Sequence, residues 1–187
     1  MSLRIYGNRL LKTLPGQQTR PTPSRVREAL FNIWQGAIAD CRWLDLCAGN
    51  GTMSAEALCR GAAQVVAIEQ SPRACNIIRQ NLQPVAGEHQ TYKVLRADVA
   101  TRLKTLQGQQ FDRIYFDPPY AGTLYQPVIQ AIASYQLLAP HGEFAAEHQR
   151  DRCAFEPIPP LEICRQKVYG NTALTFFCHS ELPTDNQ

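Results

Sequence analysis

No run of eighteen apolar residues occurs in the sequence, so no segment of it is predicted to cross a membrane. The first residues, 1–6, lack the apolar stretch of a secretory signal peptide. Internal repeats and low-complexity tracts are also missing. These absences predict a cytoplasmic globular protein. With 187 residues, 44% of them hydrophobic, the chain is long enough to bury the core of one domain.

Paired cysteines are lacking too. The seven cysteines lie singly along the chain, with no Cys-x-x-Cys and no paired histidines. Such spacing gives neither a disulfide framework nor a zinc site. We therefore expect reduced thiols that mostly fill the core, and no bound metal.

Acidic residues are scarce at the N-terminal end. Residues 1–30 hold six basic side chains against Glu28 alone, a net charge of +5; the rest of the chain sums to −2, because the whole carries +3. This asymmetry is typical of a basic arm that binds a polyanion, although a merely solvated basic surface is the alternative. The candidate RNA contacts in this part of the chain are Arg4, Arg9, Lys12, Arg20, Thr22 and Arg25.

Short runs of β-forming residues alternate with helix-like segments, which predicts an α/β fold with a doubly wound, mostly parallel sheet. Turn signals at Gly7-Asn8 and Gly170-Asn171 predict hairpins at 3–14 and 162–178. The other predicted strands are 43–47, 64–68, 91–96, 112–116 and 142–147, and the predicted helices are 24–38, one through 55–58, 71–82, 98–106 and 123–135.

The strand at 112–116 runs into Asp117-Pro118-Pro119-Tyr120, where two prolines must end it. The carboxyl ends of parallel strands are where α/β proteins bind ligands. The Asp117 carboxylate and the Pro118 carbonyl can each accept one N–H of an exocyclic amine, which frees the nitrogen lone pair for attack. Tyr120 would stack on the base. The alternative is an ordinary turn with a solvated aspartate.

A glycine loop follows the strand at 43–47, and Gly49 and Gly51 would let a ligand approach the backbone closely. Asp45 just before the loop would repel a pyrophosphate, but it suits a cationic sulfonium or an α-amino group. Glu69 ends the next strand and is suited to ribose hydroxyls, while Asp98 ends the third and can accept from an adenine amine. Alternatively, Glu69 is a charge facing solvent and Asp98 is a helix N-cap.

These motifs make the sequence resemble the class I S-adenosylmethionine methyltransferases, and more closely the bacterial RsmD type, which methylates guanine N2 in small-subunit (16S) ribosomal RNA. The resemblance covers nearly the whole chain and also rests on Thr19-Arg20-Pro21-Thr22, on 25–32 and on Tyr169-Gly170-Asn171-Thr172. Cys47 and Asn50 stand where Phe and Ser are commoner.

The resemblance implies a Rossmann-like, seven-stranded sheet with an antiparallel last strand and an N-terminal hairpin extension. It implies one methyltransferase domain, made of an arm at 1–18, the catalytic fold at 19–180 and a frayed tail at 181–187. The cofactor would be S-adenosylmethionine. The partner would be ribosomal RNA, within the small subunit or an assembly intermediate, and the enzyme would act as a monomer.

Site residues follow from the same resemblance. Residues Asp117, Pro118, Pro119 and Tyr120 would present the base, and Lys167, Tyr169 and Asn171 would lie at the substrate entrance if 162–168 runs parallel to the other strands. The cofactor would contact Asp45, Cys47, Ala48, Gly49, Gly51, Glu69, Gln70, Asp98, Val99 and Asp117.

Three other functions are weighed against this one. Adenine-N6 methylation of DNA uses a similar prolyl turn, but the chain has no room for a DNA-recognition domain. An NAD-dependent oxidoreductase is disfavoured by Asp45, by the missing substrate domain and by Ser54, which stands at the third glycine of the dinucleotide motif. A non-catalytic RNA-binding module would have no use for the prolyl turn.

Overall fold

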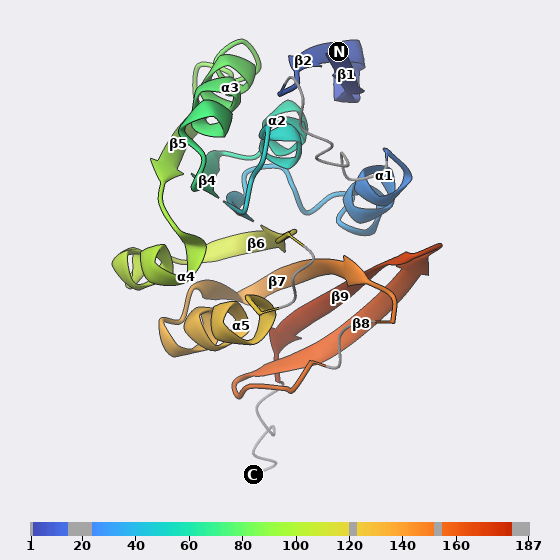
Figure 1. Cartoon of the computed structure of the whole chain (residues 1–187), viewed down its shortest axis with the longest axis vertical. Coiled ribbons are helices and arrows are strands. Elements are labelled where there is room, and N and C mark those ends of the chain that lie inside the picture. The colour runs from blue at the N-terminus through green and yellow to red at the C-terminus, as the bar shows by residue number, and fades with distance from the viewer. Residues whose placement is uncertain (1, 15–23, 120–122, 152–154, 181–187) are drawn as a thin grey trace.

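The computed structural model describes residues 2–14, 24–119, 123–151 and 155–180. Its main sheet has seven strands in the order β5-β4-β3-β6-β7-β9-β8 (Figure 1), and only β9 runs against the others. The predicted seven-stranded, mostly parallel fold is therefore confirmed. The strands are β3 Arg42–Leu46, β4 Gln64–Glu69, β5 Thr91–Arg96, β6 Phe111–Phe116, β7 Leu138–Gln149, β8 Leu161–Tyr169 and β9 Thr172–His179.

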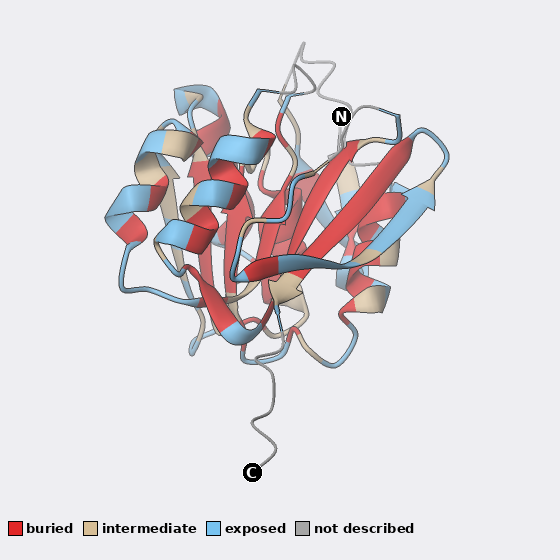
Figure 2. Ribbon diagram, turned by 90° about the horizontal axis from the view of Figure 1, so that it is seen from below, coloured by how far each residue is buried: buried red, intermediate tan, exposed pale blue. Residues whose placement is uncertain are grey.

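Helices cover both faces of this sheet. One buried cluster packs the sheet against α1 (Ser24–Ile33), α2 (Thr52–Cys59) and α3 (Pro72–Leu82). The other packs it against α4 (Val99–Arg102), the 3-10 turn η2 (Leu103–Leu106) and α5 (Tyr125–Ser134). Figure 2 shows buried residues running through the strands between the two helical layers. No helix in the described ranges is long and apolar enough to span a membrane.

The turn signals in the sequence have the expected effect. Ser71 caps α3 by accepting a hydrogen bond from the Ala74 N–H at 3.3 Å, and Gly61 follows α2 with φ +96°. Two element boundaries were wrong by four or five residues. The helix predicted to reach residue 38 ends at Ile33, because the chain turns at Gly36 with φ +80°. The strand predicted from 142 already begins at Leu138.

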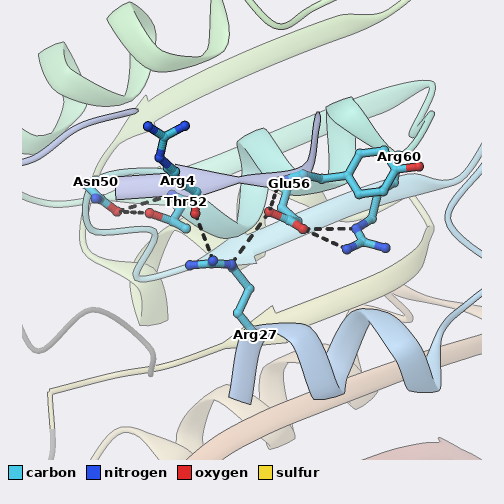
Figure 3. Close-up of polar contacts among 7 residues, drawn as sticks. Arg4, Arg27, Asn50, Thr52, Glu56 and Arg60 are labelled. Carbon is cyan, nitrogen blue, oxygen red and sulfur yellow. Dashed lines mark hydrogen bonds and ion pairs between the residues drawn. The ribbon is translucent and has the colours of Figure 1, made fainter. Parts of the chain in front are cut away.

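The N-terminal hairpin forms a separate two-stranded sheet that lies beside α2 and α3 (Figure 1). It consists of β1 Ser2–Ile5, the 3-10 turn η1 Tyr6–Asn8 and β2 Arg9–Lys12. The buried carboxylate of Glu56 accepts the Tyr6 N–H at 3.1 Å, and Arg27 donates to the Arg4 carbonyl at 3.0 Å (Figure 3). Because Glu56 belongs to α2 and accepts the Tyr6 N–H, its carboxylate fixes the hairpin to α2, and Arg27 and Arg60 pair with the same carboxylate.

The C-terminal hairpin brings its turn to the edge of the sheet at which the parallel strands end. Strands β7 and β8 both pair antiparallel with β9, so they run in the same direction. Thr172 pairs with Gln149 at the end of β7 and with Tyr169 at the end of β8. Lys167, Tyr169 and Asn171 were predicted at the substrate entrance on the condition that 162–168 runs parallel to the other strands, and β8 does run in that direction.

Candidate active site

The loop between β3 and α2 has a backbone that few side chains tolerate. Cys47, Gly49 and Gly51 all have positive φ, of +62°, +58° and +76°. A Cβ on Gly51 would lie 3.0 Å from the Ile78 side chain, so space as well as φ requires glycine there. A Cβ on Gly49 would meet nothing within 4 Å, so the open side of the loop is at Gly49.

Asp45 is buried at the end of β3 and caps the first turn of α2. Its Oδ2 accepts the Ser54 N–H at 3.1 Å and the Ser54 hydroxyl at 2.6 Å. Burial raises the pKa of Asp45 to about 7, against the lowering effect of these two hydrogen bonds. The Thr52 N–H is taken by Asn50 Oδ1 at 3.2 Å. Two amides of the helix start are thus already bonded within the protein, which is unlike a pyrophosphate-binding turn.

Glu69 links the loop that follows β3 to the loop that follows β4. Its Oε2 accepts the Gly49 N–H at 3.0 Å, and its Oε1 accepts the Ser71 N–H at 2.7 Å. Asp98 is exposed and caps α4, with Oδ1 accepting the Thr101 N–H at 3.1 Å. The N-cap considered for Asp98 from sequence is therefore present, and a ligand would have to share its carboxylate with the helix.

The pKa of the Cys47 thiol shows the electrostatic effect of the acidic side chains near it. The pKa of this thiol is raised to about 12, most by burial and then by the negative charges of Glu69, Asp117, Asp45 and Asp98, in that order. The fold thus brings together the four acids that the sequence places at four strand ends. A site with this charge favours a cation and disfavours a phosphate.

The prolyl turn continues β6 beside the glycine loop. The Asp117 N–H points to the Leu46 carbonyl at 3.5 Å, and Asp117 is partly accessible. Pro118 is buried and Pro119 is exposed. Tyr120, Arg20 and Thr22 lie outside the described residues, as does the predicted tail at 181–187.

Sequence reasoning missed Asn81, a buried amide on the inner face of α3. Its Nδ2 donates to the Asn50 carbonyl at 2.9 Å and to the Lys12 carbonyl at 3.0 Å, while its Oδ1 accepts the Lys12 N–H at 2.9 Å. One side chain therefore joins the hairpin to the glycine loop. The available signal was a polar residue on the apolar face of an amphipathic helix.

Sequence reasoning also missed the buried pair of Tyr115 and Glu147, in which the Tyr115 hydroxyl donates to Glu147 Oε2 at 2.6 Å. The remaining candidates differ in exposure: Val99 is buried, Ala48 and Tyr169 are partly buried, and Gln70 is exposed. Among the described ranges no cluster of three or more metal-ligating side chains occurs. The exposed RNA candidates are Arg4, Arg9, Lys12, Arg25, Lys167 and Asn171.

The parallel sheet, the glycine loop and the acid-lined edge together define a methyltransferase of the Rossmann-like class. The chain matches the family described as Conserved hypothetical protein 95 over residues 3–178, and it belongs to that family. Among curated relatives, Ribosomal RNA small subunit methyltransferase D of Haemophilus influenzae is 30% identical over 82% of this chain and 80% of the relative.

Solved structures agree with this assignment. A chain named "Putative methyltransferase yhhF" from Escherichia coli superposes with a TM-score of 0.84 at 27% identity, covering 96% of this chain and 98% of that one. A hypothetical protein of Thermus thermophilus, TTHA0928, gives a TM-score of 0.77 at 27% identity, with 95% and 99% covered.

Proposed function

We propose that this protein transfers the methyl group of S-adenosylmethionine to the exocyclic N2 amine of a guanine in small-subunit ribosomal RNA. The observation that carries the proposal is that Asp98, Glu69, Asp45 and Asp117 lie at the carboxyl ends of four neighbouring parallel strands, β5, β4, β3 and β6, the last of which runs into the Asp-Pro-Pro turn. The names of the relatives support ribosomal RNA as the substrate class. The chain would act as one catalytic domain with an RNA-binding arm, within the bacterial cytoplasm.

The residues present fit the cofactor. S-adenosylmethionine supplies a methyl group already activated by a sulfonium charge. The acid-lined loop offers negative charge for that cation, with Asp45 nearest the start of the loop. The open side of Gly49 leaves room for the methionine chain, Glu69 would accept from the ribose hydroxyls, and Asp98 would accept from the adenine amine.

The chain's own part in the reaction is to position the amine. The Asp117 carboxylate and the Pro118 carbonyl would each accept one N–H of the amine, which would hold the nitrogen and free its lone pair for attack on the methyl group that the cofactor supplies. Because the methyl group is activated beforehand, most of the rate enhancement comes from this orientation. The base must leave its stack to reach the turn, which favours a loop nucleotide.

The test is incubation with radiolabelled S-adenosylmethionine and ribosomal RNA, free and in small subunits, followed by nucleoside analysis. The expected product is N2-methylguanosine at one position. Label in N6-methyladenosine would replace guanine by adenine as the target. Binding of NADH without binding of S-adenosylmethionine would refute the proposal.

A further inference from the structure

An exposed aromatic ring lies at the tip of the N-terminal hairpin. Tyr6 begins the turn η1 and is 53% exposed, whereas every other aromatic side chain in the described part of the chain is buried or partly buried. A single exposed apolar side chain is ordinary on a protein surface. Tyr6 differs from that ordinary case because its ring and its backbone are both held in place by α2.

The ring of Tyr6 lies against the guanidinium of Arg60, whose central carbon is 4.5 Å from the ring centroid. The same carbon is 4.8 Å from the centroid of the buried Phe31 ring. Glu56 accepts two hydrogen bonds from Arg60, at 2.8 and 3.1 Å (Figure 3), and it also accepts the Tyr6 N–H. Arg60 therefore cannot leave the ring without breaking an ion pair to a buried carboxylate.

One face of the Tyr6 ring is thus covered by a cation, and the exposed area lies on the opposite face and the ring edge. Unpaired nucleic-acid bases stack on aromatic rings that are presented in this way. Because every base has a π-face, such a contact tolerates different sequences. A ring that is already ordered loses little conformational entropy when a base stacks on it.

The charge around Tyr6 favours RNA over a protein as the partner. Residues 1–14 include no acidic residue. Three exposed cations belong to the same hairpin: Arg4, Arg9 and Lys12. Glu56, the carboxylate to which the hairpin binds, is buried and already paired with Arg27 and Arg60. Phosphates can therefore approach the hairpin without repulsion while a base stacks on Tyr6.

The tip of the hairpin lies away from the glycine loop. Helix α2 begins after that loop at Thr52 and ends at its C-cap Arg60, about 12 Å away at the rise of an α-helix. Lys12, at the other end of the hairpin, is joined through Asn81 to the glycine loop. A base on Tyr6 would thus belong to a different nucleotide from the one that reacts, and Tyr6 would contribute to RNA affinity and not to the chemical step.

We propose that Tyr6 is a stacking platform for an unpaired base of the RNA substrate, outside the nucleotide that is methylated, and that Arg60 positions its ring. The inference rests on the proposed function, which supplies RNA as the substrate class. It adds to the charged arm a contact of another kind, because stacking on Tyr6 requires an unpaired base and neutralises no phosphate.

The experiment measures RNA affinity of the full chain by fluorescence anisotropy. The probes are a short single-stranded RNA of mixed sequence and the same RNA annealed to its complement. Tyr6→Leu keeps apolar bulk but removes the ring, and it should raise Kd for the single strand by about fivefold to a hundredfold. Kd for the duplex, whose bases are already stacked, should change by less than about twofold. Tyr6→Phe and Tyr6→Trp keep a ring and should stay within about twofold of wild type.

Controls separate stacking from burial of apolar area and from charge. Leu10 is 57% exposed on the same hairpin and has no ring, so Leu10→Ser should change Kd by less than about twofold. The slope of log K against log salt should be the same in Tyr6→Leu as in wild type. Arg60→Lys keeps the charge but not the planar contact, so it should lose part of the affinity alone and little more in a Tyr6→Leu background.

Thermal unfolding and S-adenosylmethionine binding like those of wild type identify a folded variant. Unchanged single-strand affinity in a folded Tyr6→Leu variant would overturn the inference. Equal losses for single strand and duplex, or an equal loss in Leu10→Ser, would also overturn it, since neither result requires a ring stacked on an unpaired base. A loss of affinity for assembled small subunits but not for free RNA would assign Tyr6 to a protein contact instead.

Failure of the proposed function gives a different result. Wild-type protein that binds neither form of RNA would refute RNA as the substrate class. Wild-type protein that binds and methylates RNA, with no sensitivity of binding to Tyr6→Leu, would refute the stacking platform alone.

Discussion

The proposed function divides the edge at which the parallel strands end into a cofactor side and a substrate side, and the two are built in different ways. On the cofactor side the bonded residues are closer in sequence: Glu69 binds Ser71 two residues on and Gly49 twenty residues back, and Asp45 binds Ser54 nine residues on. On the substrate side the hydrogen-bonded residues are far apart in sequence: Tyr115 and Glu147 are 32 residues apart, and His148 and Thr175 are 27 residues apart. The cofactor side is therefore formed within one or two consecutive β-α units, whereas the substrate side requires the strands of the completed sheet.

The largest expected effect is on the substrate side. In the proposed mechanism Asp117→Ala removes the acceptor that aligns the amine, so kcat should fall by about a hundredfold or more, in the range for a preorganised polar contact. Cofactor affinity should stay close to that of wild type, as measured by calorimetry. Asp112→Ala is the matched control, because Asp112 lies at the other end of β6 and pairs with Arg42. Near-normal turnover in Asp117→Ala would make the turn merely structural.

The cofactor side should show the opposite pattern. Glu69→Ala should weaken S-adenosylmethionine binding by roughly 1.5–3 kcal/mol, the range for a hydrogen bond to a charged group. It also removes the bonds that Glu69 accepts from Gly49 and Ser71. Titration of the cofactor at fixed RNA should show a raised KM and a kcat that recovers at saturation. A lowered kcat with an unchanged KM for the cofactor would mean that Glu69 affects turnover and not cofactor binding, which would contradict the division into two sides.

The buried carboxyl of Asp45, on the cofactor side, should make the stability of the fold depend on pH. Its pKa is about 7 in the folded protein against 3.8 for the free side chain, so the folded protein holds the proton more tightly between these values. Ionisation therefore destabilises the fold as pH rises from about 4 to about 7. At about 1.4 kcal/mol per pKa unit, the penalty is on the order of a few kcal/mol.

Asp45→Asn removes this titration and keeps the shape of the side chain. Urea unfolding of both proteins from pH 4.5 to 8 should show the variant gaining stability relative to wild type as pH rises, with the difference levelling above about pH 7. A difference that does not vary with pH would mean that Asp45 has the same pKa folded and unfolded.

The smallest effect is expected at the hairpin arm, outside both halves of the edge. Replacing Arg4, Arg9 and Lys12 by Gln should flatten the slope of log K against log salt for RNA binding by roughly 2 to 3 units. Stability should hardly change, since these side chains are exposed. Fluorescence anisotropy at several salt concentrations measures the slope. Gln at Arg79, Lys93 and Lys104 removes the same charge elsewhere; an equal loss there would mean that net charge, not the arm, binds RNA.

Sequence reasoning located the elements better than the contacts between them. The strand alternation, the two Gly-Asn turns and the Ser71-Pro72 helix start all reappear, because each depends on residues close together in the chain. The helix predicted over 24–38 ends five residues earlier, at Ile33. Trp34 and Ile38 keep the helical spacing and are buried, yet the chain turns between them. Burial of a periodic residue is thus compatible with a turn, and periodicity alone cannot set the boundary.

By itself, the sequence determined the order of the strands along the chain, the glycine loop with its positive φ angles, and the four acids at four strand ends. These features follow from local backbone preferences and from the rule that parallel strands end at one edge. Only the tertiary structure decided that Ser54 binds Asp45, that Asn81 joins the hairpin to the loop, and that Glu147 is buried beside Asp117. A buried polar group takes its partner from whichever segment packs against it, and that segment is chosen by the fold.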